Sequence, residues 1–218
     1  MLNLVKFGLS LIAALGTAFL AGPTLAGEIE SGIAQAVMTR PIRRSAVLLG
    51  KWLGLATFGS AFVAVAGLGQ LLIVRGTVGY WPPQPVSGLA LLAAQTIVLL
   101  TLGLLLSTMI SPMASGIVAV GLFGATWIAG VVGMVGEAFG NAGVAQVGTV
   151  SRMLLPTDGL WRGAMHAFQH PGLTQIPAFE DSPFLSMAPL TTTYLAWSGL
   201  WVALALGLAG LAFQRRDV

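Results

Sequence analysis

The 218-residue sequence contains no cysteine and very little charge. The absence of cysteine excludes a disulfide framework, a thiolate metal site and a cysteine nucleophile. Only 8% of the residues are charged and 56% are hydrophobic, whereas a soluble domain carries roughly 25% charged residues. This deficit places the protein in a lipid bilayer. The formal net charge of +3 is small and confined to a few places, so nucleic acid is not an expected partner.

Long apolar runs set the predicted architecture. Not one charged residue lies between Gly76 and Gly136. Apolar runs of about twenty residues predict transmembrane helices. We therefore predict a single all-α polytopic membrane domain over residues 1–218, with about five transmembrane helices. Their expected positions are about 3–25, 52–74, 88–109, 113–136 and 190–213.

The first apolar run, 3–25, has two interpretations. Lys6, the following apolar residues and the small-residue sequence Thr24–Ala26 fit a secretory signal peptide. Cleavage there would export the basic residues that lie between Arg40 and Lys51, against the rule that cytoplasmic loops are positively charged. A retained span that ends in the cytoplasm is the favoured interpretation.

The one dense cluster of charge follows this run, over residues 27–51. A helix over 27–39 would be amphipathic. Its apolar face would carry Ile29, Ile33, Ala36 and Val37, and its polar face Glu28, Ser31, Gln35 and Thr39. Pro41 ends such a helix, and the basic residues Arg40, Arg43 and Arg44 surround it. The pattern predicts a helix lying at the cytoplasmic surface of the membrane.

The same stretch resembles the permease subunits of ABC-2 type ABC transporters. The shared pattern is E-x-E-x-G, a short helical stretch, R-P-x-x-R and G-K, here Glu28, Glu30, Gly32, Arg40, Pro41, Arg44, Gly50 and Lys51. The order of the spans and the stretch Leu154–Ala164 before the last span are similar too. In that family the segment, here 27–40, is a cytosolic coupling helix that docks on the ATPase subunit. The implied ATPase-coupling residues are Glu28, Glu30, Ser31, Gly32, Gln35, Arg40, Pro41, Arg43, Arg44 and Lys51.

The function implied by the resemblance is a permease subunit that moves a substrate across the cell (inner) membrane, with export favoured and import left open. Its implied partners are an ABC ATPase subunit and a second permease chain, either identical or different. The sequence itself carries no ATPase motif, because Gly50-Lys51 is followed by Trp52 and no phosphate-binding loop precedes it. We therefore expect no catalytic residue and no cofactor in this chain. The substrate stays open, since uncharged spans are compatible with a lipid, a drug or an apolar peptide.

The polar segment 137–189 is too long to be a simple connector. It predicts a short external helical segment, with a stop at Pro156, an N-cap at Thr157 and an amphipathic helix after it. His166 and His170 have the i, i+4 spacing of a metal pair. Two exposed polar residues are the favoured interpretation, and no metal site is expected.

Charge also predicts orientation. The basic residues assigned to the cytoplasm are Arg40, Arg43, Arg44, Lys51, Arg215 and Arg216, and those assigned to the outside are Lys6, Arg75, Arg152 and Arg162. The C-terminus is then cytoplasmic and Met1 external. Because the coupling helix follows the second span in the ABC-2 pattern, we expect that the first of the family's usual six spans is missing here. A genuine five-span variant is the alternative.

Two other function classes rank lower. An ion-coupled secondary transporter or channel needs ionisable groups at the middle of the membrane, and the predicted spans have none. A membrane enzyme needs a cluster of acid, base, nucleophile or metal ligands, which the sequence does not offer. The polar residues inside the spans are expected to form hydrogen bonds between helices: Gln70, Gln95, Thr96, Thr101 and Thr126.

Overall fold

The computed structural model describes residues 44–169 and 189–215, together with residues 8, 12–13 and 16. Within these residues the chain is helical and contains no strand. The helices are α4 (Arg44–Val78), α5 (Pro85–Ser107), α6 (Pro112–Ala138), α7 (Ala142–Leu154), α8 (Thr157–Phe168) and α9 (Thr192–Arg215). The predicted coupling helix lies outside the described residues. Of the predicted first span only Gly8, Ile12, Ala13 and Gly16 are described, all of them helical.

Four of the described helices are long and apolar enough to cross a bilayer. They are Ser45–Val78, Pro85–Ser107, Pro112–Ala138 and Thr192–Gln214. Each contains one of the predicted spans almost entirely, which confirms an all-α polytopic membrane fold. The largest difference is in α4, which covers 44–78 where 52–74 was predicted. The helix ends at Val78, because the next residue, Gly79, has a φ of +70° that favours glycine and does not continue a helix.

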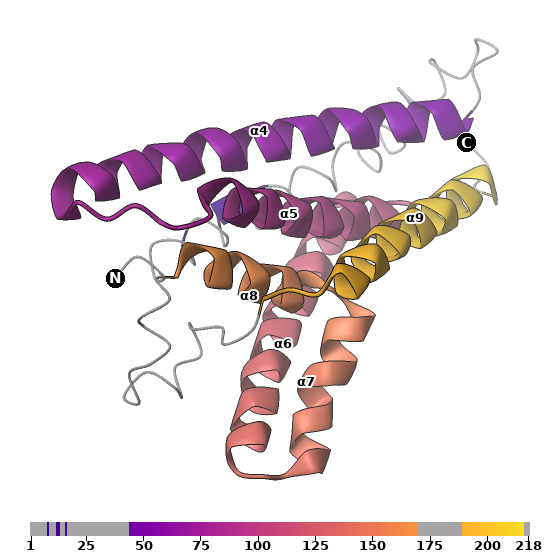
Figure 1. The fold of residues 1–218 in the computed structure, drawn as a ribbon. Helices are drawn as coiled ribbons and strands as arrows, with labels where there is room; N and C mark the ends of the chain where they lie inside the picture. The colour runs from indigo at the N-terminus through magenta and orange to yellow at the C-terminus, as the bar shows by residue number, and fades with distance from the viewer. Residues whose placement is uncertain (1–7, 9–11, 14–15, 17–43, 170–188, 216–218) are drawn as a thin grey trace.

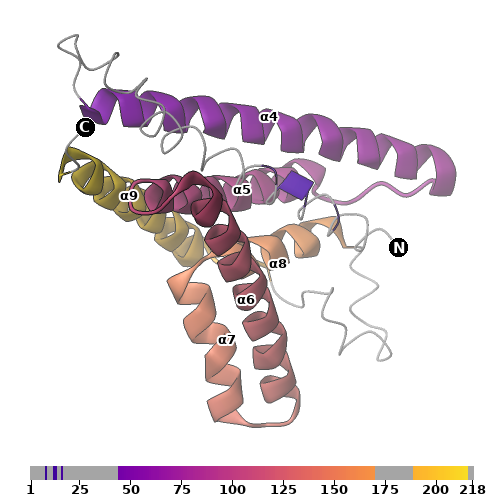
Figure 2. The same cartoon turned by 180° about the vertical axis from the view of Figure 1, so that it is seen from behind.

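Helix α5 is the centre of the bundle. It is the most buried of the four long helices, and α4, α8 and α9 pack around it (Figures 1 and 2). One core cluster joins Val98 and Leu102 of α5 to Ala119 of α6 and Leu160 of α8. Helix α5 is thus the element against which α4, α8 and α9 are positioned.

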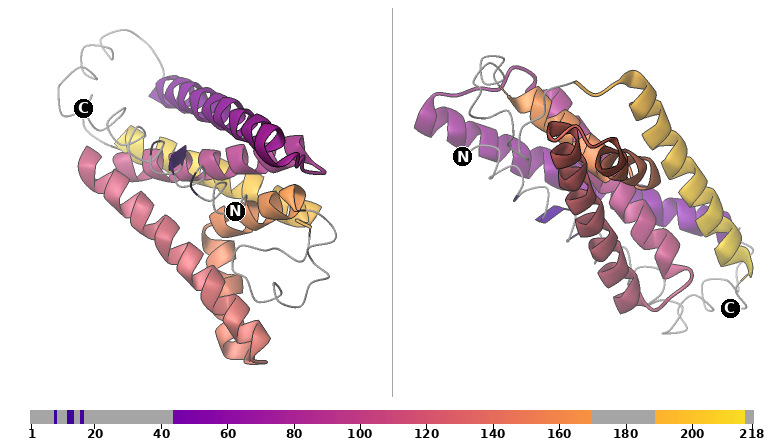
Figure 3. Two further views of the ribbon diagram at one scale, coloured as in Figure 1. Left: turned by 90° about the vertical axis from the view of Figure 1, so that its left-hand side faces the viewer. Right: turned by 90° about the horizontal axis from the view of Figure 1, so that it is seen from below.

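Helix α7 runs back along α6 from the far end of that helix, and Figure 3 shows the pair crossing the bundle obliquely. Gly140, with φ +67°, makes the turn. Asn141 caps α7, because its side-chain oxygen accepts a hydrogen bond from the Val144 amide at 3.2 Å. The two helices approach so closely that a Cβ on Gly133 would lie 2.7 Å from Gly148 Cα. Small residues at the contact therefore decide how close α6 and α7 come.

Helix α8 runs antiparallel to α5. Its last residue, Phe168, places its ring against Gly88 near the start of α5, whereas Leu160 packs with Val98 and Leu102. The hydroxyl of Thr157, in α8, contacts that of Thr126, which lies near the middle of α6. The α7–α8 elbow therefore lies beside the C-terminal half of α5 and the middle of α6.

Prolines stand at the starts of two helices. Ser111 and Pro112 occupy the N-cap and first position of α6, although the Ser111 side chain makes no capping hydrogen bond. The Thr157 N-cap is wrong, because Pro156 occupies the N-cap position and Thr157 is the first helical residue. The Thr157 hydroxyl is 3.2 Å from that of Thr126 instead, so it serves contact between helices.

Candidate functional site at the elbow between two short helices

The residues predicted to couple to an ATPase are mostly not described. Eight of them lie outside the described residues: Glu28, Glu30, Ser31, Gly32, Gln35, Arg40, Pro41 and Arg43. Arg44 is the first residue of α4, and Lys51 is half-buried two turns further on. Between them, Leu48 packs with Leu104 of α5 and Phe213 of α9. The start of α4 is thus joined to the ends of two other long helices.

Pro156 creates the elbow and leaves carbonyl groups without their helical partners. In a continuous helix the Arg152 carbonyl would accept from residue 156, but proline has no N–H. The Thr157 amide donates to the Leu155 carbonyl at 2.8 Å, so it does not serve Met153. An unpartnered carbonyl in an apolar surrounding costs free energy, so these groups need donors from elsewhere.

Three aromatic side chains of α9 supply those donors. They occupy one face of the helix, because they are spaced three and four residues apart. Each accepting carbonyl belongs to the last turn of α7. The bonds run from Tyr194 Oη to the Arg152 oxygen (3.0 Å), from Trp197 Nε1 to the Met153 oxygen (3.2 Å) and from Trp201 Nε1 to the Leu154 oxygen (2.8 Å). We call these three residues the aromatic clasp.

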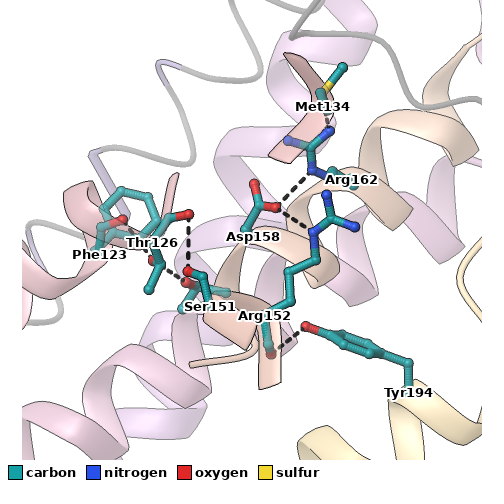
Figure 4. A network of polar contacts seen from close by, with 9 residues as sticks. Phe123, Thr126, Met134, Ser151, Arg152, Asp158, Arg162 and Tyr194 are labelled. Atoms are coloured by element: carbon teal, nitrogen blue, oxygen red, sulfur yellow. Dashed lines mark hydrogen bonds and ion pairs between the residues drawn. The ribbon is translucent and has the colours of Figure 1, made fainter. Parts of the chain in front are cut away.

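An ion-pair cluster bridges the same elbow (Figure 4). The Asp158 carboxylate is fully buried, and its Oδ2 accepts from Arg152 Nε at 3.1 Å and from Arg162 Nε at 2.8 Å. Arg152 stands in the last turn of α7 and Asp158 in the first turn of α8. Both positions also suit the helix dipoles, since a cation is favoured at the C-terminal end and an anion at the N-terminal end.

The cluster carries two cations and one anion, a formal charge of +1. Arg152 keeps a quarter of its side chain exposed, whereas Arg162 is nine-tenths buried. Arg162 Nη1 donates towards the Met134 sulfur on α6. Among the residues that the structure describes, Asp158 Oδ1 and Arg162 Nη2 have no hydrogen-bond partner. Buried charges of this kind are costly unless they are paired, so each member of the cluster depends on the others.

Two glycines make room for the cluster. A Cβ on Gly130 of α6 would collide with the Asp158 carboxylate, and a Cβ on Gly159 would collide with the Tyr194 ring. Hydroxyl groups line the adjacent contact, where Ser151 donates to the Thr126 carbonyl at 3.5 Å (Figure 4). The elbow is therefore fitted closely to α6 on one side and to α9 on the other.

The far end of α8 is held by the connection between α4 and α5. The Tyr80 hydroxyl donates to the Phe168 carbonyl at 2.7 Å, and the Gln84 amide donates to the Ala167 carbonyl at 3.3 Å. Burial raises the pKa of Tyr80, so its phenol keeps the proton it donates at neutral pH. Beside it, the Arg75 guanidinium lies 5.3 Å from the centre of the Trp81 ring. Both ends of α8 thus receive bonds from other elements.

An apolar groove of about 740 Å³ lies on another side of the α6–α7 contact. Its lining includes the apolar residues Leu122, Ala129, Val147 and Val150, together with Trp201 of the aromatic clasp. Thr126 and Ser151 add hydroxyl groups to the lining. A concave apolar surface with a few polar groups is typical of a site for an apolar or amphiphilic molecule.

The ionic cluster is the part of the site that sequence reasoning missed. Arg152 and Arg162 were assigned to an external segment, and the absence of ionisable groups at mid-span was used against an ion-coupled transporter. The spans themselves leave that argument unchanged, because Asp158 stands on the short helix α8, but a buried carboxylate between two arginines was not expected there. The available signal was the i, i+4 spacing of Asp158 and Arg162 directly after a proline.

Two lesser predictions can also be compared with the structure. Thr126 and Thr101 do bond between helices, since Thr101 accepts from Trp52 Nε1 at 2.8 Å. Thr96 bonds instead within its own helix, to the Leu92 carbonyl. His166 is half-buried on α8, and His170 lies outside the described residues. No group of three histidine or carboxylate residues comes together in the described part of the chain.

Comparison with known proteins agrees with this architecture. No curated protein and no solved structure matches the chain. One protein family does match, over residues 7–218, and its description is ABC-2 family transporter protein. The match covers nearly the whole chain, including α4 to α9. This multi-pass membrane protein therefore belongs to the ABC-2 transporter family.

Proposed function

We propose that the chain is the membrane-spanning permease subunit of an ABC-2 exporter, driven by a separate ATPase subunit through the segment 27–40. The observation that carries this proposal is the family match over residues 7–218. The start of α4 supports it. The predicted coupling segment leads directly into α4 at Arg44, and α4 has 35 residues. At 1.5 Å per residue, α4 is about 52 Å long, well beyond the ~30 Å of a hydrocarbon core.

The mechanism would be mechanical. ATP binding closes two ATPase subunits, the coupling helix moves as a rigid body, and the helices that contact it shift. Glu28, Ser31 and Gln35 would face the ATPase, with Arg40, Arg43 and Arg44 at acidic partner residues or lipid headgroups. The packing of Leu48 against Leu104 and Phe213 gives such movement a route into α5 and α9. Because Phe213 packs beside the start of α4, a cytoplasmic coupling segment would put the C-terminus in the cytoplasm as well.

Charge reversal in the coupling segment tests this function. The permease is purified in mild detergent, and both the associated ATPase chain and ATP hydrolysis are measured. Glu28→Lys, and Gly32→Trp separately, should abolish association or stimulated hydrolysis while leaving the helical content and melting temperature unchanged. Glu137→Lys is the matched control, because it reverses an exposed carboxylate at the end of α6. Unchanged association in both coupling variants contradicts the docking assignment.

A second permease chain would complete the transport path. Helix α6 leaves large apolar side chains exposed along its length: Ile117, Val118, Leu122, Ile128, Val132 and Val135. Because the bilayer also covers such surfaces, the test is the mass of the functional complex in nanodiscs. Two permease chains per complex are expected. A transport-competent complex with one permease chain contradicts the pairing.

The groove between α6 and α7 favours an apolar or amphiphilic cargo over a sugar or an inorganic ion, because most of its lining is apolar. An ion-coupled secondary transporter is the competing function, and the buried Asp158 is the observation that favours it. Both arginine Nε atoms bond the same Asp158 oxygen, which suits a fixed structural pair better than a proton-exchanging group. Transport that follows a proton gradient without ATP would overturn the ABC mechanism.

A further inference from the structure

Helix α9 touches functionally different parts of the molecule near its two ends. Near its C-terminal end, Ala209 and Phe213 pack with Leu48 of α4 and Leu104 of α5. Near its N-terminal end, the aromatic clasp holds the last turn of α7. From Tyr194 to Phe213 the axis rises about 28 Å at 1.5 Å per residue, close to the thickness of the hydrocarbon core. One rigid helix thus joins the start of α4 to the elbow.

From this geometry we propose that α9 connects the start of α4 to the α7–α8 elbow. In this proposal Tyr194, Trp197 and Trp201 are positioning residues that make α7 and α8 move with α9. The inference rests on the proposed function, since it takes the start of α4 as the element that an ATPase displaces. It assigns to these three aromatic residues a role in transmission as well as in packing.

Separating α9 from α7 would break the three hydrogen bonds that satisfy backbone carbonyl groups at the end of α7. The three carbonyls are consecutive and stand at a helix end where Pro156 removes one of the normal donors. If α9 moved away without α7, these carbonyls at a helix end would lose the donors that α9 supplies. Moving α9 and α7 together keeps the bonds. The Tyr194 ring also fits against Gly159, so α9 contacts the first turn of α8 at the same point.

The ion-pair cluster makes the two short helices respond as one body. Asp158 of α8 is bonded to Arg152 of α7 across the elbow, and Tyr194 bonds the carbonyl of the same Arg152. A displacement of α9 therefore acts on a residue that is itself tied to α8. The far end of α8 is attached to the α4–α5 connection through Tyr80 and Gln84, so the elbow end is the one that α9 controls.

Hydrogen exchange tests this inference on the assembled permease–ATPase complex in nanodiscs. Amide exchange is measured with ADP and with ATP plus vanadate, which gives a nucleotide-dependent difference for each segment. The triple variant Tyr194→Phe, Trp197→Phe, Trp201→Phe removes the three donors and keeps aromatic rings. We expect the difference across 142–168 to be present in the parent protein and lost in the triple variant, while the difference at 44–52 persists. Each single substitution should give a partial loss, which decides the matter if the triple variant does not assemble.

The control is Tyr80→Phe, which also removes an aromatic donor from a helix-end carbonyl but not from α9. It should raise exchange at the end of α8 equally in both nucleotide states and leave the difference intact. The inference is overturned if Tyr80→Phe abolishes the difference as the clasp variants do, or if the clasp variants retain it. A parent complex that responds at 44–52 but never at 142–168 overturns the inference alone. No nucleotide-dependent difference in any segment contradicts the proposed function as well.

Discussion

Helices α7 and α8 are neighbours of almost equal length, 13 and 12 residues, yet they have opposite surroundings. In α7 only Gly148 and Ser151 are buried. In α8 every residue except His166 is buried. The difference comes from neighbours, because α7 contacts mainly α6, whereas α8 lies between α5, α6 and the start of α9. Burial of a short helix is thus decided by the elements around it.

The two ends of the ion-pair cluster show the same contrast. Arg152, on α7, keeps a quarter of its side chain exposed, and Arg162, on α8, keeps a tenth. Asp158 between them is fully buried. The polar residues of α8 are therefore part of the interior and depend on one another, since an uncompensated buried charge is far more costly than an exposed one.

Removing the carboxylate of Asp158, which Arg152 and Arg162 share, should have the largest effect on stability. Asp158→Asn keeps the size of the side chain and leaves two arginines without an anion. We expect the free energy of unfolding to fall by about 3–5 kcal/mol, measured by denaturation in mixed micelles. Glu137→Gln is the control, because that carboxylate is exposed and its loss should change stability by less than about 0.5 kcal/mol. Equal effects of the two substitutions would contradict the buried cluster.

Truncating one apolar residue on each short helix sharpens the contrast. Leu160 of α8 is fully buried, and Val150 of α7 is 56% exposed. Leu160→Ala should destabilise the protein by about 2–5 kcal/mol through a cavity, and Val150→Ala by less than about 0.5 kcal/mol. The same denaturation experiment measures both. A large loss for Val150→Ala would show that another element covers α7.

The glycine contact between α6 and α7 should have a smaller effect. Gly133→Ala places a methyl group against the Gly148 backbone, and such overpacking costs about 1–3 kcal/mol. Gly124→Ala on the same helix meets no atom of the described structure within 4 Å and should gain up to about 1 kcal/mol from helix propensity. Opposite signs in thermal unfolding are expected. Stabilisation by both substitutions would mean that α6 and α7 are further apart.

The smallest expected effect concerns the hydroxyl pair between α6 and α8. Thr126→Val removes the contact with Thr157 at 3.2 Å and should cost about 1 kcal/mol. Thr57→Val is the matched control, because Thr57 is exposed and its hydroxyl bonds only to the Leu53 carbonyl of its own helix. If both variants melt at the same temperature, the pair contributes nothing to holding α8 in place.

The sequence predicts the long helices well because a bilayer imposes a simple requirement. A span needs about twenty apolar residues and satisfies its own backbone hydrogen bonds, so hydrophobic runs such as 88–109 locate helices directly. Their ends were less accurate at α4, which begins at Arg44 and not at 52, and accurate where Pro112 begins a helix. The coupling residues lie mostly in residues 27–43 and stay a prediction.

The elbow escaped sequence analysis because its polar residues look like those of a surface segment. The stretch 157–168 contains a carboxylate, an arginine and a histidine, which a local pattern assigns to water. Only the tertiary arrangement brings Arg152 to Asp158 and buries the carboxylate. Likewise, the bonds from Tyr194, Trp197 and Trp201 to α7 depend on where a helix end distant in the sequence is placed.

The position of Pro156 also has a consequence for how the protein is made. Helices of 13 and 12 residues are each about 20 Å long or less and cannot cross a ~30 Å hydrocarbon core. Neither can enter the bilayer as an independent span, and the charges of 157–168 oppose entry before Asp158 has met its arginines. We therefore expect the long helices α4, α5 and α6 to be inserted first. Because α9 is synthesised after them and holds the elbow, we expect α7 and α8 to settle only once α9 has been translated and inserted.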